Sequence, residues 1–374
     1  MTVSAPLYRP RGPLREGLFI ARPNRFVVDV DMEGQSVRAY LPNPGRLDEL
    51  LHPGAPLRLV AAPGGATEWT VVAAERFGRP VLVHTHWNND VAQALVEKGL
   101  VPGLEEAQIL RREVTEGSSR FDFLLDTASG PLVMEVKSCT LFTESAALFP
   151  DAVTERGSRH LRHLARLAEE GRRSALLFVV HSDRPRLFSP EYHRDLLFAR
   201  TLLEVRDRVE IMALAVSWQE DLSLSRDVRP LPIPWERIEA EARDGGNYLL
   251  LLRADGPFFL SDGSGTLPFD RGFYLYVGSA EREMTARMES HRRRRKTLRS
   301  PVDGLREKTA FVAAMALRGS GRFDDALVAM LEALGGRPCP LFGDGPLFGF
   351  DGDPRDGAFA ERFLALSTER LLGD

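Results

Sequence analysis

Two carboxylates, Asp122 and Glu135, lie thirteen residues apart on two short apolar runs, residues 120–126 and 131–138. The turn-forming sequence Thr-Ala-Ser-Gly at residues 127–130 separates the runs and predicts a β-hairpin. A turn centred in this segment places the two carboxylates directly opposite each other. Like charges in such positions destabilise a hairpin, so we expect a cation between them.

Lys137 follows Glu135 by two residues, so strand alternation places both side chains on one face of the hairpin. Met134 and Val136 then point the other way, into a core. Mg²⁺ usually takes one or two carboxylates and leaves its other positions to water and phosphate. Asp122 and Glu135 can supply those carboxylates. The lysine ammonium can orient an attacking water and offset charge on a phosphorane.

Glu113, in the segment Leu-Arg-Arg-Glu-Val, could reach the same metal as a further ligand. The candidate catalytic residues are therefore Asp122, Glu135, Lys137 and Glu113, with Mg²⁺ or Mn²⁺ as the cofactor. The pattern predicts a divalent-metal phosphodiesterase site. The alternative is a set of solvated polar positions on a half-exposed hairpin, because a short acid-to-acid-x-lysine pattern is common by chance.

Longer stretches around the hairpin resemble the family of sugar fermentation stimulation proteins. In chain order they are EGLFIARPNRF at 16–26, AYLPNPGRLDELL at 39–51, GSSRFDFLL at 117–125, EVKSCTL at 135–141 and FPDAVTERGSRHLRHL at 149–164. Together they cover roughly residues 10–218. So many long matches in the same order leave little room for chance.

The resemblance implies an N-terminal OB-like β-barrel and a restriction-endonuclease-like α/β domain of the PD-(D/E)XK type, with DNA binding as the family's attributed activity. The family's two acidic positions and its lysine fall on Asp122, Glu135 and Lys137, and its upstream glutamate falls on Glu113. The Arg-Lys-Thr usually found after the first barrel strands is absent near residues 68–72. A nucleic-acid contact at that point is therefore not expected.

A helix is expected to begin near Thr154, after the hairpin. Arg159, His163 and Arg166 recur in it at i, i+4 and i+7, which places three potential phosphate contacts on one face. The alternative is an ordinary solvated helix face. The matching stretches add further candidate nucleic-acid contacts at Arg25, Arg46, Arg120 and Arg156.

The composition is that of a multi-domain cytoplasmic protein. A length of 374 residues suggests two or three domains. Cys139 and Cys339 are the two cysteines, 200 positions apart, which excludes a disulfide framework and a cysteine-rich zinc site. The start of the sequence has no apolar h-region and no run approaches 18 apolar residues, so no membrane partner is expected. With a net charge of −4, any phosphate-binding surface must be local.

Several short strands with turn signals, within residues 18–41 and 57–85, predict the barrel. A helix at residues 88–99 and a buried strand at residues 174–181 then flank the hairpin and the Thr154 helix, which is the order an α/β nuclease core needs. We place the OB-like barrel at residues 1–86 and the nuclease-like domain at residues 87–226.

The sequence DVRPLPIPW at residues 227–235 has three prolines in alternate positions, which disfavours helix interior and central strand. It predicts a stiff extended linker over residues 227–244. A separate α/β unit, residues 245–374, follows. Strands are expected in it at residues 246–253 and 272–280, and a helix at residues 283–295.

This C-terminal unit resembles the GIY-YIG-like, uncharacterised (DUF123-type) domains found fused to or beside nucleases. The resemblance is carried by Gly246-x-Tyr248, YVGSA from Tyr276, and Arg287-x-x-x-His291. In GIY-YIG nucleases the tyrosines and arginine surround the scissile phosphate and a downstream glutamate holds the metal. The resemblance implies a degenerate site of Tyr248, Tyr276, Arg287, His291 and Asp324, with the aspartate in place of that glutamate. An aspartate withdraws the carboxylate by roughly 1.5 Å, so we expect this unit to add affinity rather than to cut.

The densest positive segment of the chain follows His291. It contains Arg292, Arg293, Arg294, Arg295, Lys296 and Arg299. Guanidinium groups suit phosphate, and neutralising several phosphates gives salt-dependent affinity without sequence preference. The four consecutive arginines are therefore candidate nucleic-acid contacts, and the alternative is a solvated loop.

These observations predict a multi-domain α/β protein that binds DNA, or RNA, and a Mg²⁺-dependent nuclease in its central domain. The alternative is a DNA-binding regulator linked to sugar metabolism, in which the carboxylates hold a structural metal and no bond is broken. The intact set of two acids and a lysine favours the enzyme, because a pure binding protein has little use for a lysine beside the metal.

Overall fold

The computed structural model describes residues 5–62, 64–261, 265–293, 301–340 and 345–372. The chain forms two compact units. One comprises Met1–Glu191 and Leu197–Trp235, and the other Tyr192–Leu196 and Glu236–Asp374. Among the described residues, no helix combines the length and apolar character needed to cross a membrane.

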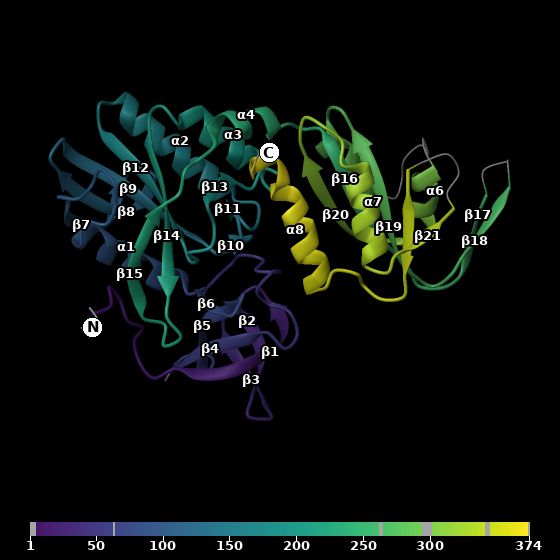
Figure 1. Ribbon diagram of the computed structural model, residues 1–374, viewed down its shortest axis with the longest axis horizontal. Helices are drawn as coiled ribbons and strands as arrows, with labels where there is room; N and C mark the ends of the chain where they lie inside the picture. Colours follow the sequence, from purple (N-terminus) through teal and green to yellow (C-terminus); the bar gives the residue numbers. More distant parts are fainter. Residues whose placement is uncertain (1–4, 63, 262–264, 294–300, 341–344, 373–374) are drawn as a thin grey trace. The chain divides into compact units, whose positions relative to one another are not determined.

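The first part of the chain is a closed five-stranded barrel with a sixth strand attached (Figure 1). Its strands are β1 (Arg15–Asn24), β2 (Val27–Met32), β3 (Gln35–Tyr40), β4 (Pro56–Ala61), β5 (Trp69–Arg76) and β6 (Arg79–Leu82). They pair in the order β3-β2-β1-β4-β5-β6, and a parallel pairing of β3 with β5 closes the barrel. A turn at Glu33 and Gly34, both with positive φ, joins β2 to β3. The predicted OB-type barrel is therefore present.

The central domain is a mixed six-stranded sheet in the order β15-β14-β12-β9-β8-β7. Its strands are β7 (Gln108–Glu116), β8 (Ser119–Thr127), β9 (Gly130–Cys139), β12 (Arg173–Val180), β14 (Glu210–Trp218) and β15 (Leu224–Pro230). Three helices accompany it, α1 (Thr85–Glu97), α2 (Glu155–Glu169) and α3 (Leu196–Val205). A small separate sheet contains β10 (Leu141–Phe142), β11 (Ala146–Phe149) and β13 (Leu187–Pro190).

Strand alternation buries both faces of this sheet. Met134 and Val136 of β9 share one core cluster with Val91 and Leu95 of α1. Val133, on the opposite face of β9, belongs to the cluster that contains Leu161 and Leu164 of α2. Glu135 and Lys137 therefore lie on the α2 face, as the alternation predicted.

Local capping explains where α1 and α2 begin. The Thr154 hydroxyl accepts a hydrogen bond from the Gly157 amide at 3.0 Å, which caps α2 at the expected position. Helix α1 starts three residues earlier than expected, because His84 Nδ1 accepts from the Trp87 amide at 3.3 Å and the His84 ring stacks on Trp87. Burial, and then the neighbouring His86, lower the pKa of His84 to about 4, which keeps this capping nitrogen unprotonated at neutral pH.

The proline-rich segment is not a free linker. Its first residues belong to β15, an edge strand in which Leu214 of β14 pairs with Pro230. The Leu231 amide continues the contact by donating to the carbonyl of Ala213, and helix α4 (Trp235–Glu241) follows. Proline is compatible with an edge strand, because its missing N–H can face away from the sheet. The first unit thus extends to Trp235, beyond the expected domain end at residue 226.

The C-terminal unit is built on an antiparallel sheet in the order β20-β16-β19-β22-β21. Its strands are β16 (Gly246–Ala254), β17 (Phe258–Ser261), β18 (Thr266–Phe269), β19 (Gly272–Ala280), β20 (Ala310–Arg318), β21 (Arg337–Cys339) and β22 (Leu347–Phe350). Its further helices are α5 (Met284–Arg292), α6 (Pro301–Lys308), α7 (Asp324–Ala333) and α8 (Gly357–Leu372). Helices α5 and α6 share a core with one face of the sheet, and α7 and α8 with the other.

Truncation tests the role of β15. A fragment ending at residue 219 should be less stable than one ending at residue 234 by at least about 3 kcal/mol, because it loses the burial of Leu224 and Leu231 at about 1.5–3 kcal/mol each. Urea denaturation of the two fragments measures the difference. Equal free energies of unfolding would mean that β15 is dispensable to the first unit.

Candidate metal and nucleic-acid site

The β8–β9 hairpin holds the two carboxylates. Its register runs from Thr127↔Gly130 to Phe123↔Met134, so the turn is centred as predicted and Asp122 lies one position beyond the last pair. There Asp122 Oδ2 accepts the amide of Val136 at 2.7 Å, so the carboxylate takes the place of a backbone carbonyl in the ladder. Asp122 Oδ1 accepts Nδ2 of Asn89, from α1, at 2.7 Å. Sequence reasoning missed Asn89.

Glu135 is 4% exposed and is held by α2 and by its own strand. Its Oε1 atom accepts from His160 Nδ1 at 2.7 Å and from Lys137 Nζ. Arg156 Nε, which can only donate, lies 3.4 Å from His160 Nε2. The His160 proton is therefore on Nδ1 and points at Glu135. Glu135 Oε2 is buried and has no hydrogen-bond partner among the residues that the structure describes.

The two carboxylates ionise differently. Burial, followed by the charge of Glu135, raises the pKa of Asp122 to about 6, against the opposing effects of the Val136 amide, Lys137 and Asn89. Burial alone would raise the pKa of Glu135, but Lys137 and His160 outweigh it and bring the pKa below its ordinary value. At neutral pH the site therefore carries two negative charges, one buried and one half-buried, beside a single lysine.

The donor set fits a hard divalent cation. Within the described residues, no group of three or more His, Cys, Asp and Glu side chains is arranged to hold a metal. Mg²⁺ does not require such a group, since it is commonly held by one or two carboxylates and retains several waters. A buried carboxylate with an unsatisfied oxygen and a half-buried carboxylate are suited to that mode of binding.

Glu113 is placed differently from the other candidate ligands. It lies on β7 opposite Asp122, between the pairs Arg112↔Phe123 and Val114↔Phe121. Its φ of +56° is in the left-handed region, and its side chain is 61% exposed and paired with Arg120 at 2.6 Å. In this conformation the Glu113–Arg120 ion pair occupies both side chains, and the ligand role of Glu113 stays a prediction.

The three candidate arginines of α2, Arg156, Arg159 and Arg166, are exposed, as is Arg162 on the same helix. His163, on the same helix, is half-buried and its Nδ1 lies 2.7 Å from Ser119 Oγ. Burial, and then the charge of Arg166, lower the pKa of His163. This histidine therefore offers a hydrogen bond rather than a positive charge to a phosphate at neutral pH.

Arg25 and Arg46 are exposed at one end of the barrel. Arg22 organises their backbones: its Nη1 donates to the Arg46 carbonyl at 2.6 Å and its Nη2 to the Arg25 carbonyl at 2.8 Å. The Leu47 amide donates to Asp151 Oδ2 at 3.3 Å, just before α2 begins. Both candidate contacts are thus connected, through ordered backbone, to the domain that holds the carboxylates.

A buried histidine supports the start of α1. Trp218 Nε1, which can only donate, donates a hydrogen bond to His181 Nδ1 at 3.2 Å. His181 Nε2 therefore carries the ring proton and can donate to Asn88 Oδ1 at 3.0 Å. Burial lowers the pKa of His181 to about 3, which keeps it neutral. Asn88 precedes the residue that holds Asp122, so this network positions α1 relative to the site.

In the C-terminal unit, Tyr248 and His291 meet as the resemblance implied. The Tyr248 hydroxyl lies 3.1 Å from His291 Nε2, and His291 Nδ1 lies 3.0 Å from Asp303 Oδ1, with all three side chains buried. Tyr276 packs beside Tyr248, with ring centroids 6.3 Å apart. Arg287 is exposed on α5, one turn before His291.

Asp324 lies on the other face of the C-terminal sheet. Its Oδ1 atom accepts from Asn247, and alternation along β16 directs Asn247 and Tyr248 to opposite faces. The structure therefore does not bring Asp324 to the tyrosines, where a metal-binding acid was expected. Arg292 and Arg293 are exposed, and Arg294 and Arg295 lie outside the described residues.

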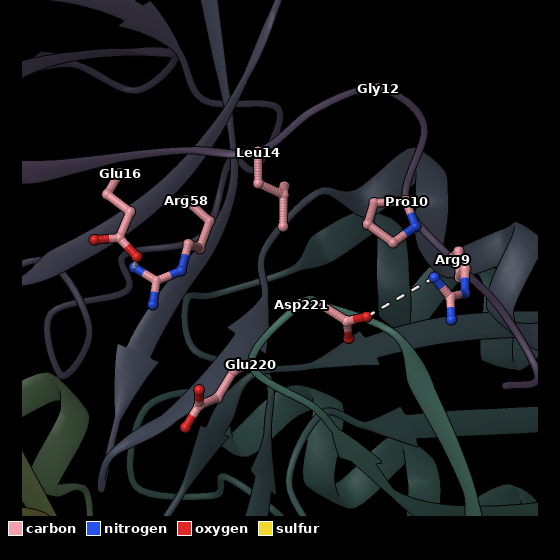
Figure 2. Close-up of a pocket in the computed structure, with 8 residues that line it drawn as sticks. All are labelled: Arg9, Pro10, Gly12, Leu14, Glu16, Arg58, Glu220 and Asp221. Carbon is pink, nitrogen blue, oxygen red and sulfur yellow. Dashed lines mark ion pairs between the residues drawn. The ribbon is translucent and has the colours of Figure 1, made fainter. Parts of the chain in front are cut away.

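A cleft of about 440 Å³ lies elsewhere in the first unit (Figure 2). It is lined by Arg9, Pro10, Gly12, Leu14, Glu16, Arg58, Glu220 and Asp221. Its three acids outnumber its two arginines, and each arginine is paired with one of the acids. The cleft shares no residue with the carboxylate site and is poorly suited to phosphate.

An OB-type barrel followed by a restriction-endonuclease-like α/β domain defines the architecture of the first unit. Family models agree: the SfsA N-terminal OB domain matches residues 20–83, the sugar fermentation stimulation protein RE domain residues 86–222, and the domain of unknown function DUF123 residues 247–345. The chain belongs to the sugar fermentation stimulation protein family.

Relatives with this name come from distant organisms. A homolog from Methanothermobacter thermautotrophicus is 43% identical over 192 residues, which are 51% of this chain and 80% of the relative. One from Chloroflexus aurantiacus is 39% identical over 204 residues, or 54% of this chain and 79% of the relative. The solved structure of Pyrococcus furiosus SfsA in complex with Ca²⁺ is similar with a TM-score of 0.58 at 30% identity, covering 62% of this chain and 99% of that one.

The shifted ionisation of Asp122 predicts a pH dependence of stability without metal. Its pKa of about 6 exceeds the ordinary 3.8, so the folded state holds this proton more tightly than the unfolded state does. The stabilisation is complete below about pH 4 and is lost as the pH rises through about 6. Between pH 4 and 7, wild type should lose on the order of 2–3 kcal/mol that Asp122→Asn does not lose.

Chemical denaturation in EDTA at several pH values measures this difference. Asp126→Asn, which removes an exposed carboxylate at the other end of β8, is the matched control and should follow wild type. Parallel curves for wild type and Asp122→Asn would show that the folded state does not shift the ionisation of Asp122.

Proposed function

We propose that the central domain binds nucleic acid, DNA or RNA, in the cytoplasm and hydrolyses its phosphodiester bonds with Mg²⁺ or Mn²⁺. The observation that carries the proposal is the buried, unsatisfied Oε2 of Glu135 near the half-buried carboxylate of Asp122. An unpaired buried carboxylate oxygen is costly. A bound divalent cation would satisfy that oxygen and offset the repulsion between the two acids.

The Pyrococcus furiosus structure supports a divalent cation, since that protein was solved in complex with Ca²⁺. Ca²⁺ and Mg²⁺ are both hard cations that take oxygen ligands. Calcium demands more ligands, which two carboxylates and solvent provide less readily. We therefore assign the smaller cation, or Mn²⁺, to the reaction in this chain.

Each residue around the carboxylates has a defined task. The cation would supply Lewis acidity toward a phosphate oxygen and toward water. His160 holds Glu135 in one orientation, while Asn89 and the Val136 amide hold Asp122. The Lys137 ammonium donates one of its three N–H groups to Glu135. Its side chain is 18% exposed, so the remaining N–H groups can donate to a water or a phosphate oxygen.

Nucleic-acid binding is supported by the exposed arginines around this site, on α2 and at the end of the barrel. They are Arg25, Arg46, Arg156, Arg159 and Arg166. Contacts from these side chains to phosphates would position a strand without reading its sequence. Because the whole chain has a net charge of −4, such binding would rely on this local surface.

Replacing the lysine separates chemistry from binding. Lys137→Ala should lower Mg²⁺-dependent cleavage of single- and double-stranded DNA and RNA by about 10²–10⁴-fold, because the ammonium acts on the reacting groups. Affinity for the same substrates should change little. Lys98→Ala, which removes an exposed lysine at the end of α1, is the matched control.

The assay also discriminates between the two functions. Undiminished cleavage by Lys137→Ala would move the chemistry to another site, such as the C-terminal unit. Binding by wild type with no difference between Mg²⁺ and EDTA in cleavage would favour the alternative, a DNA-binding regulator that breaks no bond.

Metal binding should also appear as stability. At a Mg²⁺ or Mn²⁺ concentration 100 times its dissociation constant, wild type should gain about 2.7 kcal/mol, while Asp122→Asn and Glu135→Gln should gain little. The gain should be smaller at pH 5 than at pH 7, because Asp122, with a pKa of about 6, must lose its proton to bind. Melting curves with and without metal test this, and equal shifts in all three proteins would show that these acids are not ligands.

A further inference from the structure

Large apolar side chains are exposed together on the outer surface of the barrel. Leu18 and Ile20 of β1 are 47% and 42% exposed, and Phe26 and Tyr40 are 43% and 39% exposed. Strand alternation explains why these side chains point outward. Phe19, between Leu18 and Ile20, and Ala39, just before Tyr40, are buried in the barrel core. Elsewhere in the described chain the exposed large hydrophobic residues are scattered over separate elements.

Phe26 and Tyr40 form the aromatic part of this surface. The residue after Phe26, Val27, pairs with Tyr40, and the Leu41 amide donates to the Phe26 carbonyl at 2.9 Å. The ring centroids lie 6.5 Å apart with 34° between the planes. Phe26 in the β1–β2 turn and Tyr40 at the end of β3 thus lie next to each other at one end of the barrel, and the backbone hydrogen bond from Leu41 to Phe26 ties the turn to the chain that follows β3.

Two exposed arginines lie at this end of the barrel, together with one exposed acid, Asp48, two residues after Arg46. Arg25 precedes Phe26 and is exposed, and Arg46 is exposed on the loop that Arg22 anchors. The acids on the same outer surface, Asp29 and Asp31, lie farther along β2 and have local partners. Asp29 is paired with Arg38 at 3.4 Å, and Asp31 accepts the Gly34 amide at 2.8 Å.

The loop after Tyr40 joins this surface to the carboxylate site. Its Pro42 carbonyl accepts from the Thr85 hydroxyl at 2.6 Å, at the start of the helix that carries Asn89. Its Leu47 amide donates to Asp151, just before the helix that carries His160. The loop therefore contacts the beginnings of both helices that hold the acid pair.

We propose that Phe26 and Tyr40 are a stacking platform for two unpaired bases of a single-stranded nucleic acid, whose backbone follows Arg25 and Arg46 toward the carboxylates. The stacking itself is independent of catalysis, while the direction of the strand rests on the function proposed above. Bases present flat faces for stacking only when they are unpaired, and any base can stack. A duplex hides those faces, so the platform selects for single strands.

A second copy of this chain is a less suitable occupant. In a two-fold dimer the same patch faces itself, which would bring the arginines of the two copies into one interface. A strand of phosphates instead complements the charge of Arg25 and Arg46. Because the platform reads neither base edges nor the ribose hydroxyl, DNA and RNA single strands should bind comparably.

The test compares three variants of the full chain by fluorescence anisotropy in EDTA, which prevents cleavage. Phe26→Ala/Tyr40→Ala removes both rings, Phe26→Tyr/Tyr40→Phe keeps them, and Phe259→Ala removes an exposed phenylalanine of the C-terminal unit as the matched control. The probes are labelled oligothymidine and oligouridine of about 20 nucleotides, long enough for one OB fold, and a blunt duplex of equal length.

Loss of both rings should weaken binding to either single strand by at least about tenfold, as expected for lost base stacking. Duplex affinity should change less than about twofold, and the other two variants should bind like wild type. An equal loss for single strands and duplex, no loss at all, or a loss in the ring-keeping variant would overturn the proposal. If the double variant melts early, Phe26→Ala and Tyr40→Ala are measured singly, each with an expected loss of about threefold or more.

Sedimentation velocity tests whether a second copy of the chain occupies the patch. Self-association of wild type that Phe26→Ala/Tyr40→Ala abolishes would show that the patch is a dimer interface and would overturn the proposal. Failure of the proposed nuclease is distinguishable. Ring-dependent binding of single strands without Mg²⁺-dependent cleavage would leave the platform standing and remove the nuclease. Mg²⁺-dependent cleavage together with ring-independent binding would support the nuclease and remove the platform.

Discussion

The buried carboxylate of Glu135 and the half-buried carboxylate of Asp122 repel each other, and the groups packed around them must offset this repulsion. Burial and repulsion together raise the pKa of Asp122 to about 6. The compensation comes from three directions: a backbone amide and a lysine of β9, an amide side chain of α1 and an imidazole of α2. Buried charges persist in proteins when they are paired or hold metals. Among the described residues, one oxygen of Glu135 is left without a hydrogen-bond partner, and the proposed cation would satisfy it.

The same constraint explains why the surrounding elements are fixed so firmly. Helix α1 can present Asn89 because its start is capped by His84 and held by the buried His181, both neutral at physiological pH. Helix α2 can present His160 because Thr154 caps it. Arg156 then sets the tautomer of that histidine. The side chains that contact the carboxylates are thus themselves held by further hydrogen bonds. Such a site is preorganised, as the proposed electrostatic catalysis requires.

The two other parts of the chain relate to this centre in different ways. The barrel presents rings and arginines at the end from which its loop reaches the starts of α1 and α2, so it extends the carboxylate site into a binding surface. The C-terminal unit has an aromatic and histidine cluster of its own, but Asp324 lies on the opposite face of its sheet. That separation is consistent with the proposal that assigns bond cleavage to the central domain and a binding role to the C-terminal unit.

Local pattern alone determined the hairpin, the position of its turn, the shared face of Glu135 and Lys137, the barrel strands and the Thr154 cap. Each follows from periodicity or turn chemistry over a few neighbouring residues, which is why the sequence sufficed. Only the tertiary structure decided which side chains hold the acids, because Asn89 and His160 are 33 and 25 positions from their partners. It likewise decided that Glu113 pairs with Arg120, that the proline-rich segment is an edge strand, and that Asp324 faces away from Tyr248. These outcomes depend on how separate elements pack against one another, and the residue pattern within a single element does not predict that packing.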